Sequence, residues 1–480
     1  MEMTGAQILM AVLEEQGVDT IFGFPGGAVI DIYDELVKTD IRHILVRHEQ
    51  GAVHAADGYA RASGRPGVCL VTSGPGATNT VTGIATAYMD SIPMVVITGQ
   101  VPTHLIGNDA FQEVDITGIT RPCTKHNYLV KSVDDLARVL REAFYIAMSG
   151  RPGPVLVDIP KDVANARTRW SDNTQIRIKS YQPNYKPNMK QLKKVVGLIK
   201  KAKRPLLFGG GGLILSNAAE AFTEFARQTR TPVTTSLMGL GAFPGSDPLW
   251  LGMIGMHGTY RANMSTGACD LLISIGVRFD DRVTGKTDAF ASQAQIVHID
   301  IDPTSIRKNI PVTIPIVGDC KITLAKLNKL LDKENLGDLK KTRKKWLDQI
   351  RRWKDTQPLA YKQTDVIKPQ YVVEKLYELT KGKAIITTEV GQMSSAGAGS
   401  WPSCSFWRRR SSFKSDIRSF YGFKTVSEVL LFFCPKPLSN RITITALLYG
   451  TFHDICLPLR CLLLLYFGLF RKKTKFIRFQ

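Results

Sequence analysis

A single acidic side chain, Glu49, stands where a carboxylate could act in catalysis. It follows the apolar segment 44–46 and begins the alanine-rich segment 49–60, so the sequence predicts a strand-to-helix junction there. An acid in the first turn of a helix usually caps the helix or interacts with its dipole. A carboxyl group held in an apolar crevice can also exchange a proton with a bound heterocycle. Spacing alone leaves both interpretations open.

Glycine-rich turns follow three apolar segments, at 25–27, 73–77 and 209–212. Free backbone N–H groups at the start of a helix suit an anion, although such turns also serve only to reverse the chain. The turn at 209–212 has four glycines but does not fit G-x-G-x-x-G, because the sixth position is Ile214. The mismatch disfavours a nicotinamide dehydrogenase, and the glycines are also compatible with close backbone approach.

Charged residues follow two apolar segments in the second half of the chain, in the stretches 276–285 (GVRFDDRVTG) and 298–303 (HIDIDP). Ligands of open parallel sheets bind at the carboxyl ends of the strands, where acids can bond ribose hydroxyls. Acids at such positions also cap the next helix. A long loop, 97–116, combines Gly, Pro, Phe111 and Gln112, and loops of this kind often line a binding site.

Short apolar strands alternate with helices, which predicts an α/β protein with doubly wound parallel sheets in successive domains. We expect a first domain over 1–165, a polar linker over 166–190, a second domain over 191–335 and a helical linker over 336–369. A third domain is expected to begin with a helix at 370–379 and a strand at 384–388. Strands are predicted at 20–23, 44–46, 67–72, 94–98, 155–159, 205–208, 232–235, 271–275 and 296–301.

The chain has 480 residues and a formal net charge of +21, which could suggest a nucleic-acid partner. Residues 391–480 hold 14 Lys and Arg against three Asp and Glu, so about half of that charge lies in the tail. The basic residues of the first 390 positions form no evident block. We therefore expect no nucleic-acid partner.

The eight cysteines include no C-x-x-C pair, which gives no support for a zinc or dithiol site. An amphipathic helix is predicted at 5–16, with no signal or transit segment before it. The longest apolar run, 461–470, is about half of the ~20 residues that a membrane-spanning helix needs. We expect a protein of the cytoplasm or the plastid stroma, without a membrane partner.

Together these segments resemble the large, catalytic subunit of acetolactate synthase (acetohydroxyacid synthase), a thiamine diphosphate enzyme family. The resemblance covers roughly residues 3–391. It implies a thiamine diphosphate-binding fold, with a pyrimidine-binding, an FAD-binding and a diphosphate-binding domain in succession. It rests on FGFPGGAVID, RHEQGAVHAADGYAR, TSGPGATN, ITGQVP, DAFQE, TKHNYLV, SGRPGPVLVDIPKDV, LMGLGAFPG, GMHGTYRAN, GVRFDDRVTGK and HIDIDP.

The resemblance also implies roles for individual residues. Glu49 matches the glutamate that hydrogen-bonds the aminopyrimidine ring of thiamine diphosphate and drives formation of its ylid. Phe111, Gln112 and Lys125 match residues that border the pyruvate and acceptor channel, with Pro102 at its mouth, and Gln112 and Lys125 join Glu49 as catalytic candidates. Substrate contacts are also expected at Arg282 and Lys186. Cofactor contacts are expected at Gly26, Gly27, Ala28, Arg151, His257, Gly258, Arg278, Asp281, Asp300, Asp319, Gly391 and Gln392.

The sequence departs from the family pattern after Gly391. Mg²⁺ requires oxygen ligands in octahedral geometry, which the family supplies from a Gly-Asp-Gly stretch and a later Asn. The Gly-Asp pairs at 318–319 and 337–338 lack the third glycine, and none follows Gly391. We therefore expect no metal ligands in this chain, which makes the glycines of 396–399 a weak candidate for a phosphate loop.

Residues 393–480 also differ in composition, with 11 of the 21 Phe and four of the eight Cys. We interpret this tail as out-of-frame or intron-derived translation, with a divergent domain as the alternative.

The expected activity is decarboxylation of pyruvate and transfer of the acetaldehyde unit to pyruvate or 2-oxobutyrate, in branched-chain amino acid synthesis. The chain alone is expected to be inactive. The expected assembly is a homodimer or tetramer, with a possible small regulatory subunit, and FAD is expected to be structural. The alternative is a non-catalytic FAD-binding partner of an intact enzyme.

Overall fold

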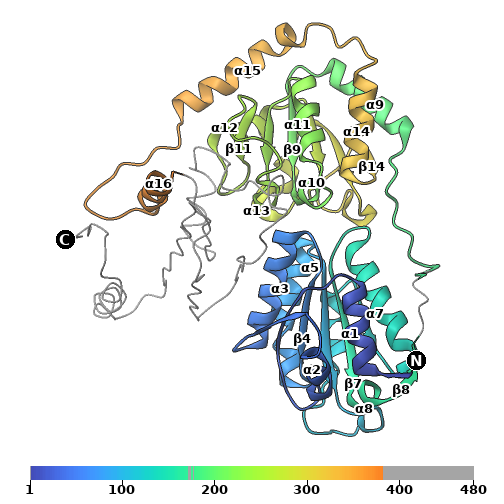
Figure 1. The fold of residues 1–480 in the computed structure, drawn as a ribbon. Coiled ribbons are helices and arrows are strands. Elements are labelled where there is room, and N and C mark those ends of the chain that lie inside the picture. The colour runs from blue at the N-terminus through green and yellow to red at the C-terminus, as the bar shows by residue number, and fades with distance from the viewer. Residues whose placement is uncertain (1, 171–174, 177, 382–480) are drawn as a thin grey trace.

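The computed structural model describes residues 2–170, 175–176 and 178–381. The predictions for the strand at 384–388, for Gly391 and Gln392, and for the tail fall outside these residues. The described chain forms two α/β units, each built on a six-stranded parallel sheet. Figure 1 shows the first unit below the second.

The first sheet has the strand order β3-β2-β4-β5-β7-β6. Its central strands are buried along their whole length, because helices cover both faces of a parallel sheet. Alternate residues of β4 enter two separate cores, with Val68 and Leu70 on one side and Cys69 and Val71 on the other. The strands are β2 (Thr20–Phe24), β3 (Arg42–Leu45), β4 (Gly67–Val71), β5 (Met94–Gln100), β6 (His126–Leu129) and β7 (Pro154–Pro160).

Two sets of helices build these cores. Helices α1 and α7 cover one face of the sheet, and α3 and α5 cover the other. Helix α1 is fixed by a capping box in which Thr4 and Gln7 satisfy each other's backbone N–H groups. The helices are α1 (Gly5–Glu15), α2 (Ile30–Leu36), α3 (Glu49–Ser63), α4 (Pro75–Thr78), α5 (Val81–Asp90), α6 (Ile116–Thr120), α7 (Val133–Met148) and α8 (Lys161–Asn165).

The second sheet has the order β11-β10-β9-β12-β13-β14, so the chain changes direction across the sheet between β9 and β12. The glycine turn after β9 serves close backbone approach, since a Cβ added at Gly210 would lie 2.1 Å from the carbonyl oxygen of Gly276. The strands are β9 (Pro205–Gly209), β10 (Val233–Thr235), β11 (Trp250–Met253), β12 (Leu271–Ile275), β13 (Gln295–Asp300) and β14 (Ile314–Val317).

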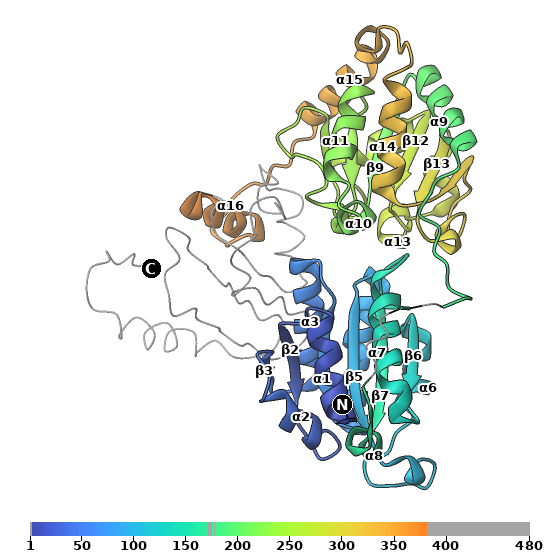
Figure 2. The same ribbon diagram turned by 45° about the vertical axis from the view of Figure 1, so that its right-hand side comes forward.

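Helices again cover both faces of this sheet, with α9, α11 and α14 on one side and α12 and α15 on the other. Helix α15 continues toward α16, which lies beside the two units in Figure 2. The helices are α9 (Met189–Lys201), α10 (Gly211–Leu215), α11 (Ala219–Gln228), α12 (Tyr260–Ala268), α13 (Asp281–Thr284), α14 (Cys320–Leu331), α15 (Leu339–Thr356) and α16 (Pro369–Thr380).

Every strand predicted within the described residues is present, and the α/β class is confirmed. The strands that the sequence pattern missed lie at sheet edges: β6, β11 and β14. Each of these strands has only four residues: β6 (HNYL) is polar and partly exposed, while β11 (WLGM) and β14 (IPIV) are apolar but contain Gly252 or Pro315, which weaken a strand pattern. A further short strand, β8 (Arg167–Arg169), lies in the segment predicted as a linker and pairs antiparallel with β1 (Glu2–Thr4).

The carboxyl ends of the second sheet face the amino ends of the first. Arg151, just before β7, pairs with Asp302, just after β13, at 3.1 Å. Arg278, after β12, donates to the carbonyl oxygen of Met89 at the end of α5, at 3.0 Å. The carboxyl ends of the first sheet, with α2 and α8, therefore point away from the second unit (Figures 1 and 2).

A buried arginine anchors α15 to the second unit. Arg343 is fully buried, and its guanidinium donates to the Thr231 hydroxyl and to the Ile199 carbonyl oxygen, both at 2.9 Å. Trp346, one turn later, donates to the carbonyl oxygen of Pro205 at 3.0 Å. These contacts join a strongly basic helix to the core.

Replacing this guanidinium should destabilise the second unit. We expect Arg343→Ala to lower the free energy of unfolding by about 2–4 kcal/mol, because two buried acceptors lose their donor and a cavity forms. Urea denaturation followed by tryptophan fluorescence measures the loss. The control Lys345→Ala, on the exposed face of the same helix, should change it by less than ~0.5 kcal/mol. Equal losses in the two variants would contradict the anchoring role.

Candidate functional site

Glu49 is the first residue of α3, but it does not cap that helix. The cap is His48, whose Nδ1 accepts from the backbone N–H of Gln50 at 3.1 Å. The Glu49 side chain is buried, and its Oε2 accepts from the Asn79 amide at 2.9 Å. Among the described residues, no hydrogen bond reaches its Oε1. One oxygen of the carboxylate is therefore held in place and the other is available to a ligand.

The glycine turns that follow β2 and β4 surround this carboxylate. A Cβ added at Gly76 would lie 3.3 Å from Glu49 Oε1, and one added at Gly26 would lie 2.6 Å from the Cβ of Thr72. At Gly27 an added Cβ would meet no atom within 4 Å. The Thr72 hydroxyl is buried and, within the described chain, has no hydrogen-bond partner. Bare backbone, an unpaired hydroxyl and a free carboxylate oxygen therefore lie close together.

The loop that carries Phe111 and Gln112 meets the same turn. Gln112 has a positive φ of 58°, and its backbone packs so closely on Gly74 that a Cβ there would lie 2.6 Å from the Gln112 carbonyl oxygen. Phe111 is 88% exposed. The turn 73–79 thus contacts Glu49 at one end and Gln112 at the other. The structure brings together the candidates that sequence placed in three separate motifs.

Lys125 lies at the opposite end of the first sheet. Its backbone N–H donates to Pro154, the first residue of β7, whereas Glu49 and Gln112 lie beyond the carboxyl ends of the strands. The length of β7 separates the two ends by about 20 Å at ~3.3 Å per residue. Within one chain, Lys125 is therefore not a neighbour of Glu49.

The ammonium of Lys125 is enclosed by backbone and phenol oxygens. It donates to Ser149 at 2.8 Å, to the Tyr181 hydroxyl at 2.9 Å, and to the carbonyl oxygen of Ile146. Burial, and then the nearby Arg151, lower the pKa of Lys125 to about 8. Arg151 itself donates to the Ser91 hydroxyl at 2.8 Å and to Asp302. Arg151 thus belongs to the contact between the two units, and Lys125 lies close to it.

The remaining candidates of the second unit gather at the carboxyl ends of its sheet. They have different local roles: Asp319 caps α14 through the Ile322 N–H at 2.9 Å, while Asp281 and Arg282 are mostly exposed and 3.8 Å apart. Exposed Lys186 lies in the linker, where the neighbouring Tyr185 hydroxyl accepts from Gly150. The candidates at these strand ends are His257, Gly258, Arg278, Asp281, Arg282, Asp300 and Asp319.

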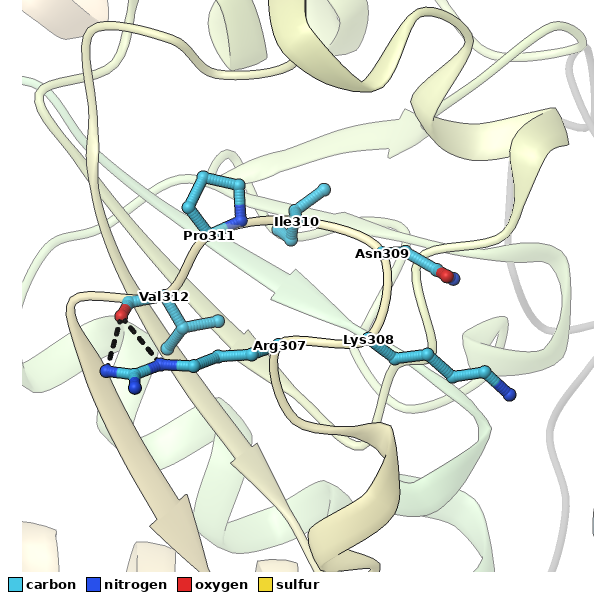
Figure 3. Close-up of a pocket in the computed structure, with 6 residues that line it drawn as sticks. All are labelled: Arg307, Lys308, Asn309, Ile310, Pro311 and Val312. Carbon is cyan, nitrogen blue, oxygen red and sulfur yellow. Dashed lines mark hydrogen bonds between the residues drawn. The ribbon is translucent and has the colours of Figure 1, made fainter.

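A shallow hollow of about 430 Å³ lies inside the loop 307–312 (Figure 3). Arg307 closes the loop by donating to the carbonyl oxygen of Val312 at 3.3 and 3.2 Å. Asn309 donates to the carbonyl oxygens of Arg278 and Phe279, at 3.0 and 2.8 Å. The hollow therefore adjoins the strand ends of the second sheet rather than Glu49.

Neither a metal centre nor a membrane span is evident in the described part of the chain. No group of three or more His, Cys, Asp or Glu side chains there is arranged to hold a metal ion. No described helix is long and apolar enough to cross a membrane.

Two polar residues of the Glu49 site, Thr72 and Asn79, were not singled out from the sequence. They are the first and last residues of the motif TSGPGATN, which was the available signal.

Two buried carboxyl groups should make stability depend on pH. Burial raises the pKa of Asp158, in β7, and of Asp300, at the end of β13, to about 7 each. The folded chain therefore keeps these protons to higher pH than the unfolded chain. Each group should lower the free energy of unfolding as pH rises from about 4 to 7, by up to ~1.4 kcal/mol per pH unit.

Asp300→Asn should remove one of these two contributions. We expect the difference in unfolding free energy between variant and wild type to shift in favour of the variant as pH rises from 5 to 8, measured by urea denaturation. Asp281→Asn, at an exposed position, should leave the pH dependence unchanged. Parallel pH profiles for Asp300→Asn and wild type would contradict a titration of Asp300 in this range.

Matches to known protein families fall separately on the two structural units. Residues 3–119 match the thiamine pyrophosphate enzyme N-terminal TPP binding domain, and residues 192–327 match the thiamine pyrophosphate enzyme central domain. The first match contains Glu49 and Gln112, and the second contains the strand ends of the second sheet.

Curated relatives extend the similarity beyond these domains. The chain is 51% identical over 396 residues to the acetolactate synthase large subunit of Buchnera aphidicola subsp. Acyrthosiphon pisum, covering 81% of this chain and 68% of that protein. It is 49% identical over 405 residues to the acetolactate synthase large subunit of Haemophilus influenzae, covering 84% and 70%. It is 50% identical over 392 residues to acetolactate synthase 3, chloroplastic, of Brassica napus, covering 81% and 60%. The chain therefore belongs to the acetolactate synthase large-subunit family of thiamine diphosphate-dependent enzymes.

Proposed function

We propose that the reaction of this chain is the decarboxylation of pyruvate and the transfer of the acetaldehyde unit to a second pyruvate or to 2-oxobutyrate, in branched-chain amino acid synthesis. The observation that carries the proposal is the Glu49 carboxylate, with one oxygen held by Asn79 and the other unbonded among the described residues. A fixed acid beside a ligand space can exchange a proton at a defined atom.

The residues around Glu49 fit the aminopyrimidine half of thiamine diphosphate. A flat ring can approach backbone at Gly27, where an added Cβ would meet no atom within 4 Å, whereas Gly26 and Gly76 pack against the Thr72 side chain. When bound, the thiazolium of this cofactor accepts the electron pair that decarboxylation leaves behind. Glu49 would then hold and move the proton, and Asn79 would orient Glu49. Phe111 and Gln112 would border the substrate and limit access of water.

We also propose that FAD binds at the carboxyl ends of the second sheet, in a structural role. Ligands of open α/β sheets favour this edge, where Arg151 lies near Asp300 and Arg278 contacts Met89 of the first unit. His257, Gly258 and Asp281 are further candidates. Asp319 is a weaker one, because its carboxylate already caps α14.

We further propose that the chain is inactive alone. The Gly-Asp-Gly stretch and the later Asn that would hold Mg²⁺ against the diphosphate are missing from the sequence. The alternative role is that of a non-catalytic, FAD-binding partner of an intact large subunit, in a dimer or tetramer and with a possible small regulatory subunit. The cytoplasm and the plastid stroma are the proposed locations.

Two assays separate these proposals. The purified chain with pyruvate, Mg²⁺ and thiamine diphosphate should form no acetolactate in a colorimetric assay, and sustained turnover would refute the inactivity. Co-expression with a full-length large subunit should yield a hetero-oligomer that retains flavin. If only homo-oligomers are recovered, the partner role fails.

Coding DNA tests the interpretation of the tail. If residues 393–480 are out-of-frame or intron-derived, translating codons 385–480 in the other frames should reveal a Gly-Asp-Gly…Asn pattern. Mass spectrometry that finds tail peptides at the same abundance as peptides from residues 1–380 would contradict this interpretation.

Removing the acid should abolish catalysis without loss of flavin. In any assembly whose only competent first domain is this chain, Glu49→Gln should lower acetolactate formation by about 10²–10⁴-fold, because proton transfer is lost. Flavin absorbance should stay unchanged. Glu14→Gln, at an exposed position of α1, is the matched control. Wild-type rates in Glu49→Gln would remove the basis of the proposed function.

A further inference from the structure

The segment from β7 to α8 places two carboxylates beside the loop 101–115. Asp158 lies near the end of β7 and is 1% exposed, and Asp162 lies in the first turn of α8. Neither carboxylate belongs to the group of residues around Glu49 described above. Both nevertheless make hydrogen bonds that lead into the loop carrying Phe111 and Gln112.

Asp158 holds the far end of the loop through Gln100. The Gln100 amide nitrogen donates to Asp158 Oδ2 at 3.0 Å and to the carbonyl oxygen of Val114 at 2.8 Å. The amide oxygen of Gln100 accepts from the Val101 N–H at 2.9 Å. A single buried side chain thus bonds residues on both sides of the loop. The other oxygen of Asp158 accepts from the Thr98 hydroxyl at 2.7 Å, which is not part of the loop.

Asp162 holds the near end of the loop. Its carboxylate accepts from the Thr103 backbone N–H at 3.0 Å and from the Thr103 hydroxyl. Between the two anchored ends, the Glu113 carboxylate accepts from the N–H groups of Gly107 and Ala110 and so shapes the tip. The backbone of Gln112 is thereby pressed against Gly74, in the turn that also contacts Glu49. The chain of contacts runs from β7 and α8 to the Glu49 site.

We propose that Asp158 and Asp162 are positioning residues, which act through Gln100 and Thr103 to hold the loop 101–115 against the Glu49 site. The relevance to catalysis rests on the proposed function, but the anchoring itself does not. Buried side chains that fix the neighbours of a site restrict it to the productive geometry, and a loop tied at both ends keeps Phe111 and Gln112 in one arrangement.

Hydrogen–deuterium exchange of the full chain tests the anchoring directly. Gln100→Met removes both arms of the first anchor at similar size, and Asp162→Ala removes the second. Asp158→Ala removes the acceptor that holds the Gln100 amide nitrogen in place. Each variant should raise exchange about tenfold or more at the hydrogen-bonded amides of the loop, with α7 (Val133–Met148) unchanged. These amides belong to Thr103, Leu105, Gly107, Ala110 and Glu113.

The matched control is Thr98→Val, which removes a hydrogen bond from the same Asp158 carboxylate without touching Gln100. It should leave loop exchange within about twofold of wild type. Chymotrypsin cleavage after exposed Phe111 is a second readout, and it should accelerate in the three anchor variants only. Because Asp162 is only half buried, Asp162→Ala should fold even if a buried variant does not.

The proposal is overturned if loop exchange and cleavage stay at wild-type rates in folded Asp162→Ala and Gln100→Met. It is also overturned if Thr98→Val loosens the loop as much as they do, or if α7 loosens in parallel. None of these readouts uses acetolactate formation or cofactor binding. If the loop is anchored but an assembly whose only competent first domain is this chain forms no acetolactate, the proposed function fails and the anchoring stands.

Discussion

A parallel sheet covered by helices on both faces leaves only its two ends for contact with ligands and other domains. In the first unit, β4, β5 and β7 are buried along their whole length, so neither face can hold a ligand. The catalytic candidates of that unit, Glu49, Gln112 and Lys125, all lie beyond a strand end. Because of this constraint, the contact between the units and the Glu49 site lie at different ends of the first sheet.

The two ends of the first sheet have different tasks. Its amino end contacts the second unit through Arg151 and Asp302, with Lys125 enclosed close by. Its carboxyl end carries Glu49, the glycine turns and the loop 101–115. The candidate flavin region and the candidate thiamine region are thus separated by the length of a strand. A site that needs Lys125 beside Glu49 would therefore have to combine two chains.

At the carboxyl end of the first sheet, close contacts between the turns fix the positions of Glu49 and Gln112. Gly74 and Gly76 lie two residues apart, and they approach Gln112 and Glu49 respectively. A side chain at either position would move one of these residues. Asn79, in the same turn region, fixes one oxygen of Glu49. The proposed anchors at Asp158 and Asp162 would fix the loop 101–115 in the same way, on the side of the turn where Gln112 meets Gly74.

Sequence by itself determined the α/β class, the buried strands and the motifs that indicate the family, because apolar runs and glycine turns are local signals. It also located Glu49 at a strand-to-helix junction. It missed the edge strands β6, β11 and β14, because each has only four residues and is either polar or contains Gly or Pro. Tertiary structure alone decided that His48 rather than Glu49 caps α3, and that Asn79 and Thr72 join the site. It alone placed Lys125 at the far end of the sheet and connected Asp158 with the loop through Gln100. These relations depend on which strands become neighbours, and side-chain contacts across a sheet leave no periodic trace in the sequence.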